Sequence, residues 1–126
     1  MISFTIPIKA VNVSNQREHH FARHRRVKAQ REAVGWCWQT IPLAERLAIA
    51  GAVDGGGLLV KVVRVAPREL DPHDGLACSL KPVVDQIAQQ LSVDDKDKRI
   101  EWRYGQERGT KAKEYAVRVE IEPKSS

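Results

Sequence analysis

The sequence predicts a single α+β domain, residues 1–126, in which helices pack on a mostly antiparallel sheet in the order β-α-α-β-α-β-β. Three observations predict this class. The 126 residues suit one domain with one hydrophobic core. Strand-like segments are separated by segments whose apolar residues recur every three or four positions, as in amphipathic helices. The last two segments are both strand-like, and successive strands favour antiparallel pairing.

The first half of the chain is expected to supply one strand and two helices. Residues 2–8 alternate as a short strand, which the polar stretch 12–15 interrupts. Helical composition follows over residues 20–39. A second helix is expected to begin at Pro42 and to end at Gly51, because proline suits a first helical turn and glycine suits the position after the last one.

A turn at residues 54–57 should lead into a buried strand and then a helix. Residues 58–65 are apolar on both faces except for Lys61 and Arg64, as in a central strand. Residues 75–91 show the spacing of an amphipathic helix. Its apolar stripe consists of Leu76, Leu80, Val83, Ile87 and Leu91.

Two strands are expected to close the chain. In residues 99–104 and in residues 114–122, apolar side chains alternate with charged ones, which is typical of half-buried strands. The polar segment 105–113 between them is short enough for a hairpin loop. The two strands are therefore expected to pair with each other.

The charge of the chain is uneven along the sequence. The net charge is +5, and residues 1–64 hold ten Lys and Arg against four acids, whereas residues 65–126 hold eleven against twelve. Residues 17–31 alone hold six Lys and Arg and one Glu. Such a segment suits contact with a phosphate backbone, although most charge runs are simply solvated helix faces. The candidate DNA-binding residues are Arg23, Arg25, Arg26, Lys28 and Arg31.

The composition argues against several classes of protein. Cys37 and Cys78 are the only cysteines and form no CxxC pair, so neither a disulfide framework nor a zinc ribbon is expected. No apolar run approaches the roughly 20 residues that cross a bilayer. The first ten residues also lack the charged-then-apolar order of a secretory signal. We therefore expect a cytoplasmic protein without membrane contact.

Carboxylates gather around one lysine in the second half of the chain. Asp71 and Asp74 precede Lys81, and a second acidic cluster at 94–97 follows it. On a helix, Asp74, Lys81 and Asp85 fall within about 40° of one another, opposite the apolar stripe. Several carboxylates and one ammonium group are what magnesium-assisted hydrolysis of a phosphodiester requires.

The order of these residues resembles that of the RusA-type Holliday junction resolvases, small phage-derived endonucleases in which aspartates flank a helix with an essential lysine. The matching residues are Asp71, Asp74-Gly75-Leu76, Leu80-Lys81, Asp85 and Asp94-Asp95. The early strand ending in Pro7 and the following Asn15 are also similar. Gly75 stands where the family usually has asparagine, which removes one potential ligand.

The resemblance implies a site and an activity. Asp71, Asp74 and Asp95 would be the metal ligands and Lys81 the catalytic cation, with the other acids of the 94–97 cluster, Asp94 and Asp97, as alternatives for the third ligand. The cofactor would be Mg2+, with Mn2+ as a substitute. The activity would be that of an endodeoxyribonuclease that nicks four-way or other branched double-stranded DNA during recombination or repair. The alternative is a basic nucleic-acid-binding module without catalysis, whose acids are helix caps and turn residues.

Helix length raises a question about how this site could assemble. A continuous helix over residues 75–91 would place its two ends roughly 25 Å apart. The three residues from its end to Asp94 can span only about 10 Å of that distance. Either the helix breaks at Pro82, or the two acidic clusters meet across a twofold dimer. A four-way junction is itself twofold symmetric, and its resolution needs two symmetric nicks. A homodimer is therefore expected, and sites shared between its subunits remain an open alternative.

Overall fold

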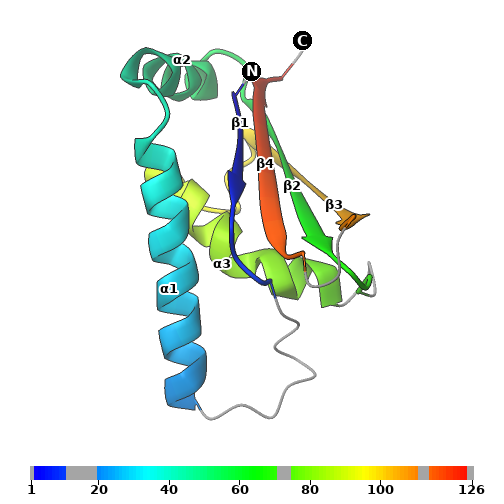
Figure 1. The fold of residues 1–126 in the computed structure, drawn as a ribbon. Coiled ribbons are helices and arrows are strands. Elements are labelled where there is room, and N and C mark those ends of the chain that lie inside the picture. The colour runs from blue at the N-terminus through cyan, green and yellow to red at the C-terminus, as the bar shows by residue number, and fades with distance from the viewer. Residues whose placement is uncertain (1, 11–19, 71–74, 111–113, 125–126) are drawn as a thin grey trace.

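The computed structural model describes residues 2–10, 20–70, 75–110 and 114–124. The element order is the expected one (Figure 1). The elements are β1 (Ile2–Ile6), α1 (His20–Gln39), α2 (Leu43–Asp54), β2 (Leu58–Ala66), α3 (Gly75–Gln90), β3 (Ile100–Arg108) and β4 (Ala116–Pro123). None of the helices in these ranges is long and apolar enough to cross a membrane.

The four strands form one sheet in the order β1-β4-β2-β3. β4 pairs antiparallel with both β1 and β2, whereas β3 pairs parallel with β2. The expected hairpin between the last two strands is therefore wrong. Val60 of β2 lies opposite Trp102 of β3 on one side and Ile121 of β4 on the other. The helix α3 carries the chain back to the start of β2, so β3 is added at the sheet edge and β4 takes the central place.

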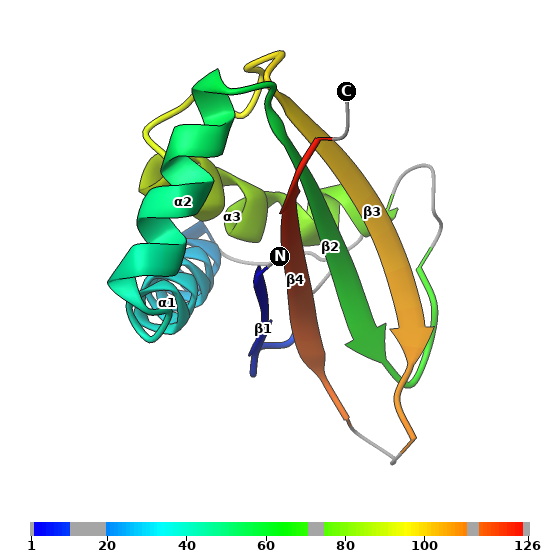
Figure 2. The same ribbon diagram turned by 90° about the horizontal axis from the view of Figure 1, so that it is seen from above.

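The helices cover one face of the sheet (Figure 2). The apolar stripe predicted for α3 is buried along its whole length against this face. Fully buried side chains from β2, β4 and α3 form the centre of the core. The other face of the sheet carries many charged side chains beside Leu59, Val63 and Val65 of β2: Lys61 is exposed there, between Arg103 and Glu120 in the neighbouring strands.

Two expected helix boundaries differ from the structure. α2 continues past Gly51 to Asp54 and ends at Gly55, because an exposed glycine costs a helix only about 1 kcal/mol. α3 continues through Pro82 without a break, although proline cannot donate the helical hydrogen bond to the carbonyl of Cys78. Of the two alternatives for bringing the acidic clusters together, the helix broken at Pro82 is therefore wrong.

Gly57 is expected to be the glycine least tolerant of substitution. Its φ of +95° disfavours other residues, and an added Cβ would press against the carbonyl oxygen of Arg99. That oxygen accepts the hydrogen bond from the amide of Leu58 at 2.8 Å, so it cannot move freely. Gly57→Ala should lower the free energy of unfolding by about 3 kcal/mol or more, as measured by urea denaturation.

Gly56 provides the matched control for this substitution. Its φ is also positive, at +124°, but an added Cβ there meets open space. Gly56→Ala should therefore cost only the backbone strain, about 1–2 kcal/mol. Equal losses for the two variants would show that the contact with Arg99 does not matter.

Candidate functional site

Lys81 lies in the middle of α3 with its ammonium group between two carboxylates. Its Nζ is 3.0 Å from Asp85, one helical turn further on, and it also pairs with Asp95 of the loop after α3. The side chain of Lys81 remains 55% exposed. The hydrogen bonds that Lys81 donates to Asp95 and Asp85 raise the pKa of Lys81 above its ordinary value, and the bond to Asp95 lowers the pKa of that carboxyl group. The lysine is therefore a firmly charged, solvent-accessible cation.

Asp95 reaches Lys81 because the chain reverses direction directly after α3. Ser92 takes a left-handed conformation with a φ of 58°. The amide of Val93 then donates to the carbonyl of Ala88, and the amide of Ser92 to that of Gln89, both at 3.0 Å. This is the Schellman arrangement that ends many helices. It turns the following loop back alongside α3, toward the lysine.

The indole of Trp102 then holds the loop in place by donating to the backbone oxygen of Asp95 at 3.1 Å. The broken helix and the dimer were considered for the meeting of Asp71 with the 94–97 cluster, and Asp71 lies outside the described residues. For Lys81 and Asp95, a continuous helix within one chain is sufficient.

The two neighbouring aspartates of this loop have local partners. Asp94 accepts a hydrogen bond from the amide of Lys96 at 2.8 Å. Asp97 accepts bonds from the amide of Arg99 at 2.9 Å and from its guanidinium at 3.0 Å. These bonds lower the pKa of Asp97 to about 2. Among the three acids, Asp95 is the one whose carboxylate the structure brings to the lysine.

Asp71 and Asp74 lie outside the described residues, but the chain on either side of them is anchored. The amide and carbonyl of Leu70 bond to the side chain of Gln106 in β3, at 2.9 and 2.8 Å. Gly75 begins α3 and is buried. The rise along the helix from Gly75 to Lys81 is about 9 Å.

Arg64 of β2 anchors the backbone shortly before residue 71. It is a buried arginine, and burial lowers its pKa. Its guanidinium donates to the carbonyl of Ala10 at 3.1 Å and to that of Arg68 at 2.7 Å. Sequence reasoning treated Arg64 only as an exception in an apolar strand. The signal in the sequence was a charged residue within an apolar central strand, because a buried guanidinium needs hydrogen-bond acceptors such as backbone carbonyls.

Tyr104 of β3 completes the surroundings of the lysine. It is partly exposed on the helix-covered face, opposite Val62 of β2. Burial raises the pKa of the Tyr104 hydroxyl; of the nearby charges, that of Lys81 lowers this pKa, and those of Asp95 and Asp85 raise it. The hydroxyl therefore stays protonated near neutral pH. It lies close enough to Lys81, Asp85 and Asp95 for their charges to influence its pKa.

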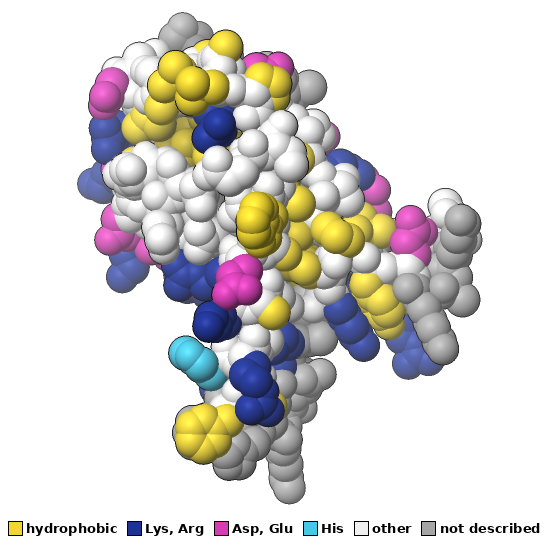
Figure 3. All heavy atoms as spheres, turned by 60° about the vertical axis from the view of Figure 1, so that its left-hand side comes forward, with side chains coloured by type: hydrophobic (Ala, Val, Ile, Leu, Met, Phe, Trp, Pro, Cys, Tyr) yellow, Lys and Arg dark blue, Asp and Glu magenta, His cyan; other side chains and the backbone are white. Residues whose placement is uncertain are grey.

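The predicted DNA-binding residues all lie on α1, which packs against α3, but they differ in their surroundings. Arg31 donates to Gln86 at 3.0 Å and to Gln89 at 2.6 Å. Arg23 and Arg26 line a cleft shared with Lys81. Lys28 lines a separate hollow together with Arg31, and Arg25 is exposed. Figure 3 shows Lys and Arg side chains gathered over the lower part of this face, where α1 begins.

Within the described part of the chain, no three His, Cys, Asp or Glu side chains are arranged to hold a metal ion. The predicted ligands Asp71 and Asp74 are outside that part, and Asp95 is inside it. The residues that the structure does bring together are thus Lys81, Asp85 and Asp95.

Comparison with known proteins adds no assignment: no protein-family model matches the chain, and no curated protein matches it in sequence.

Proposed function

We propose that this protein is a magnesium-dependent endodeoxyribonuclease that nicks four-way or other branched DNA. The observation that supports it most is the ion-pair cluster in which Asp85 and Asp95 hold Lys81 at the surface, next to the basic helix α1. The residues of this cluster belong to the pattern that resembles RusA-type resolvases. An exposed ammonium held beside carboxylates and a phosphate-binding surface suits hydrolysis of a phosphodiester.

Lys81 has a defined chemical task in this proposal. Attack on a phosphodiester adds negative charge to the phosphoryl oxygens and to the leaving 3′ oxygen. The ammonium of Lys81 would stabilise that charge or protonate the leaving oxygen. Asp85 and Asp95 restrict its position, because an ammonium with two carboxylate partners samples fewer orientations than a free lysine side chain.

The donor chemistry of the site fits a hard divalent cation. Asp95 already faces a positive charge in the structure, that of the lysine. Its carboxylate, with those of Asp71 and Asp74, would hold Mg2+ or Mn2+, which prefer oxygen ligands. When bound, such an ion supplies Lewis-acid polarisation of the phosphate and a more acidic water.

The rival function is a basic nucleic-acid-binding module without catalysis. Asp94 and Asp97 behave as that rival expects, since both bind backbone amides within their own turn. Asp95 differs, because its carboxylate contacts a lysine fourteen residues away along the chain. The nuclease proposal accounts for this contact, and the module does not require it.

A cleavage assay on a labelled four-way junction separates the two functions. We expect nicking in Mg2+ or Mn2+, little in EDTA, and a lower rate on linear duplex of the same sequence. Binding of the junction without nicking in either metal would favour the module. Equal nicking of linear duplex would keep the nuclease but contradict the preference for branched DNA.

We also propose that the protein acts as a homodimer, which suits a twofold-symmetric junction. The corner between α1 and α2 exposes three large apolar side chains: Trp36 is 75% exposed, Leu43 60% and Leu47 63%. Exposed apolar side chains of this size are common at protein interfaces. Sedimentation should show a dimer that Trp36→Glu weakens.

Mixing two inactive variants tests whether the active sites are shared. Asp71→Asn and Asp95→Asn chains would restore one intact site per mixed dimer if Asp71 and Asp95 came from different subunits. Asp95 contacts Lys81 of its own chain, and the helix from Gly75 to Lys81 rises by only about 9 Å. We therefore expect Asp71 of the same chain to reach this site and the mixture to show no restoration. Nicking by the mixture well above that of either variant would contradict this expectation.

A further inference from the structure

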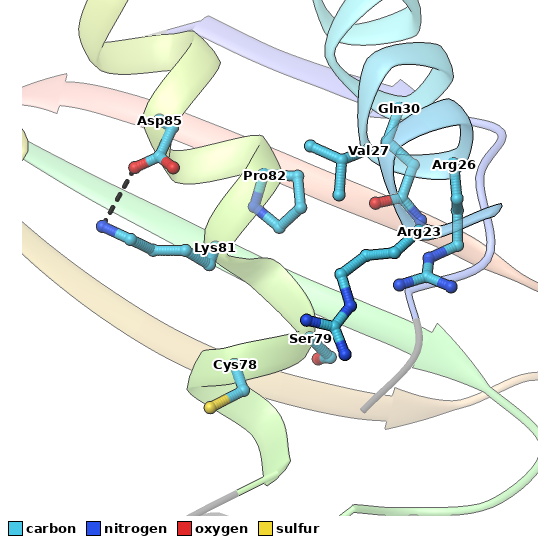
Figure 4. Close-up of a pocket in the computed structure, with 9 residues that line it drawn as sticks. All are labelled: Arg23, Arg26, Val27, Gln30, Cys78, Ser79, Lys81, Pro82 and Asp85. Atoms are coloured by element: carbon cyan, nitrogen blue, oxygen red, sulfur yellow. Dashed lines mark ion pairs between the residues drawn. The ribbon is translucent and has the colours of Figure 1, made fainter. Parts of the chain in front are cut away.

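The charged end of Lys81 is turned away from the basic helix α1. In Figure 4, the Lys81 side chain extends from α3 on the side opposite Arg23 and pairs there with Asp85. The second partner of the lysine is Asp95, whose backbone oxygen accepts a hydrogen bond from the indole of Trp102 in β3. The ammonium therefore lies on the β3 side of the helix.

Alternate residues of β3 connect this place with the other predicted part of the site. Trp102 donates to the backbone oxygen of Asp95, and the side chain of Gln106 bonds both the amide and the carbonyl of Leu70. Tyr104 lies between Trp102 and Gln106 on the same face of the strand, about 7 Å along the strand from each. The strand thus anchors the chain near both groups of predicted metal ligands, and Tyr104 stands midway between the two anchor points.

Tyr104 combines exposure with a neutral hydrogen-bond donor. It is 43% exposed, whereas Ile100 on the same face of β3 is buried. The charges of Lys81, Asp85 and Asp95 influence its hydroxyl, which keeps its proton near neutral pH. A protonated phenol can donate one hydrogen bond, and it brings no charge of its own to the ion pairs beside it. Such a donor beside an ammonium suits an oxygen atom that becomes more negative during a reaction.

We propose that the Tyr104 hydroxyl is a further catalytic group, which donates a hydrogen bond to a non-bridging oxygen of the phosphate under attack. This inference rests on the proposed function, and it adds β3 to the elements that contact the substrate. As water attacks the phosphorus and the bond to the 3′ oxygen breaks, negative charge is spread over the non-bridging oxygens. The phenol transfers no proton. The attacking water releases its proton to solvent, and Lys81 or solvent protonates the leaving oxygen.

Tyr104→Phe and Tyr115→Phe form a matched pair, because the chain has two tyrosines and each variant loses one hydroxyl. Tyr115 precedes β4, on the other side of β2 from β3, and its ring faces the ammonium of Lys9 at 4.7 Å. At saturating junction, Tyr104→Phe should lower the single-turnover nicking rate about 10- to 100-fold and leave the Kd for the junction within about 3-fold. Tyr115→Phe should leave both within about 2-fold. Equal rates for the two variants would overturn the proposal.

A binding measurement separates the failure of this inference from the failure of the proposed function. In the Tyr115→Phe background, labelling with fluorotyrosine places a single fluorine reporter in the chain, at Tyr104. Its NMR signal should shift when a four-way junction binds in Ca2+, which prefers oxygen ligands as Mg2+ does. The signal of Tyr115 in Tyr104→Phe should not shift. If the protein nicks no junction yet the Tyr104 signal shifts, the contact with DNA stands and the nuclease proposal fails. A Tyr104 signal that bound junction leaves unchanged would overturn the contact.

Discussion

Lys81→Ala is expected to lower the nicking rate on a saturating four-way junction about 10²- to 10³-fold, the usual loss when one charge-stabilising group is removed from a reacting centre. The physical reason is that the ammonium stands between Asp85 and Asp95 at the surface, where developing negative charge on a phosphate could meet it. The rate is measured in a single turnover with excess protein, so that product release does not limit it.

The fold should survive this substitution. The Lys81 side chain is 55% exposed, and exposed ion pairs contribute about 0–1 kcal/mol to stability. The free energy of unfolding should therefore change by no more than about 1 kcal/mol. A large loss of rate with little loss of stability would place Lys81 in the reaction and not in the core.

Lys61→Ala is the control for the lost charge. Lys61 is exposed on one face of the sheet, whereas the helices and Lys81 lie on the opposite face. Both variants reduce the net charge equally and should weaken long-range attraction to DNA to a similar degree. If Lys61→Ala slows nicking as much as Lys81→Ala does, the effect belongs to net charge, and the catalytic role of Lys81 is wrong.

The local elements were predictable because their signals are local. Helix α3 could be read from its apolar spacing, and Lys81 and Asp85 share a helix face by simple periodicity. The pairing of the strands was harder to predict from the sequence. Alternation in residues 100–108 and 116–123 shows that each strand has a buried face, but it does not name the neighbouring strand. The crossover through α3 decides that β3 joins the edge of β2, and this is a property of the whole fold.

The sequence placed Lys81 and Asp95 in one site, but it did not predict the direct ion pair between them, for a related reason. Ser92 ends α3 in a left-handed conformation that is most common for glycine, so the sequence carries a weak signal for the reversal. Gln106 and Arg64 support the chain near residues 71–74 through backbone carbonyls and amides, and such contacts leave no periodic pattern. The contacts around Lys81 and residues 71–74 therefore depend on how distant segments pack in the fold, which the residue types alone do not reveal.

Asp95→Asn should lower nicking at least as far as Lys81→Ala does, by about 10³-fold. The substitution keeps the size of the side chain but removes the charge that pairs with Lys81 and that would contact a metal ion. Binding of the junction should remain equal or become tighter, because one fewer carboxylate repels the phosphates. A filter or gel assay of binding, run in parallel with the nicking assay, separates the two effects.

The neighbouring aspartates provide the sharpest controls. Asp94→Asn removes the same charge one residue away, where the carboxylate accepts a hydrogen bond from the amide of Lys96 within its own turn. Asp97→Asn breaks the pairing with Arg99, which also reaches Asp54 at 2.5 Å and so ties the loop to the end of α2. We expect Asp94→Asn to nick at close to the wild-type rate and Asp97→Asn to lose stability before activity. If Asp94→Asn or Asp97→Asn loses more nicking activity than Asp95→Asn does, the proposed role of Asp95 is wrong. The loop would then use a carboxylate other than the one that faces Lys81.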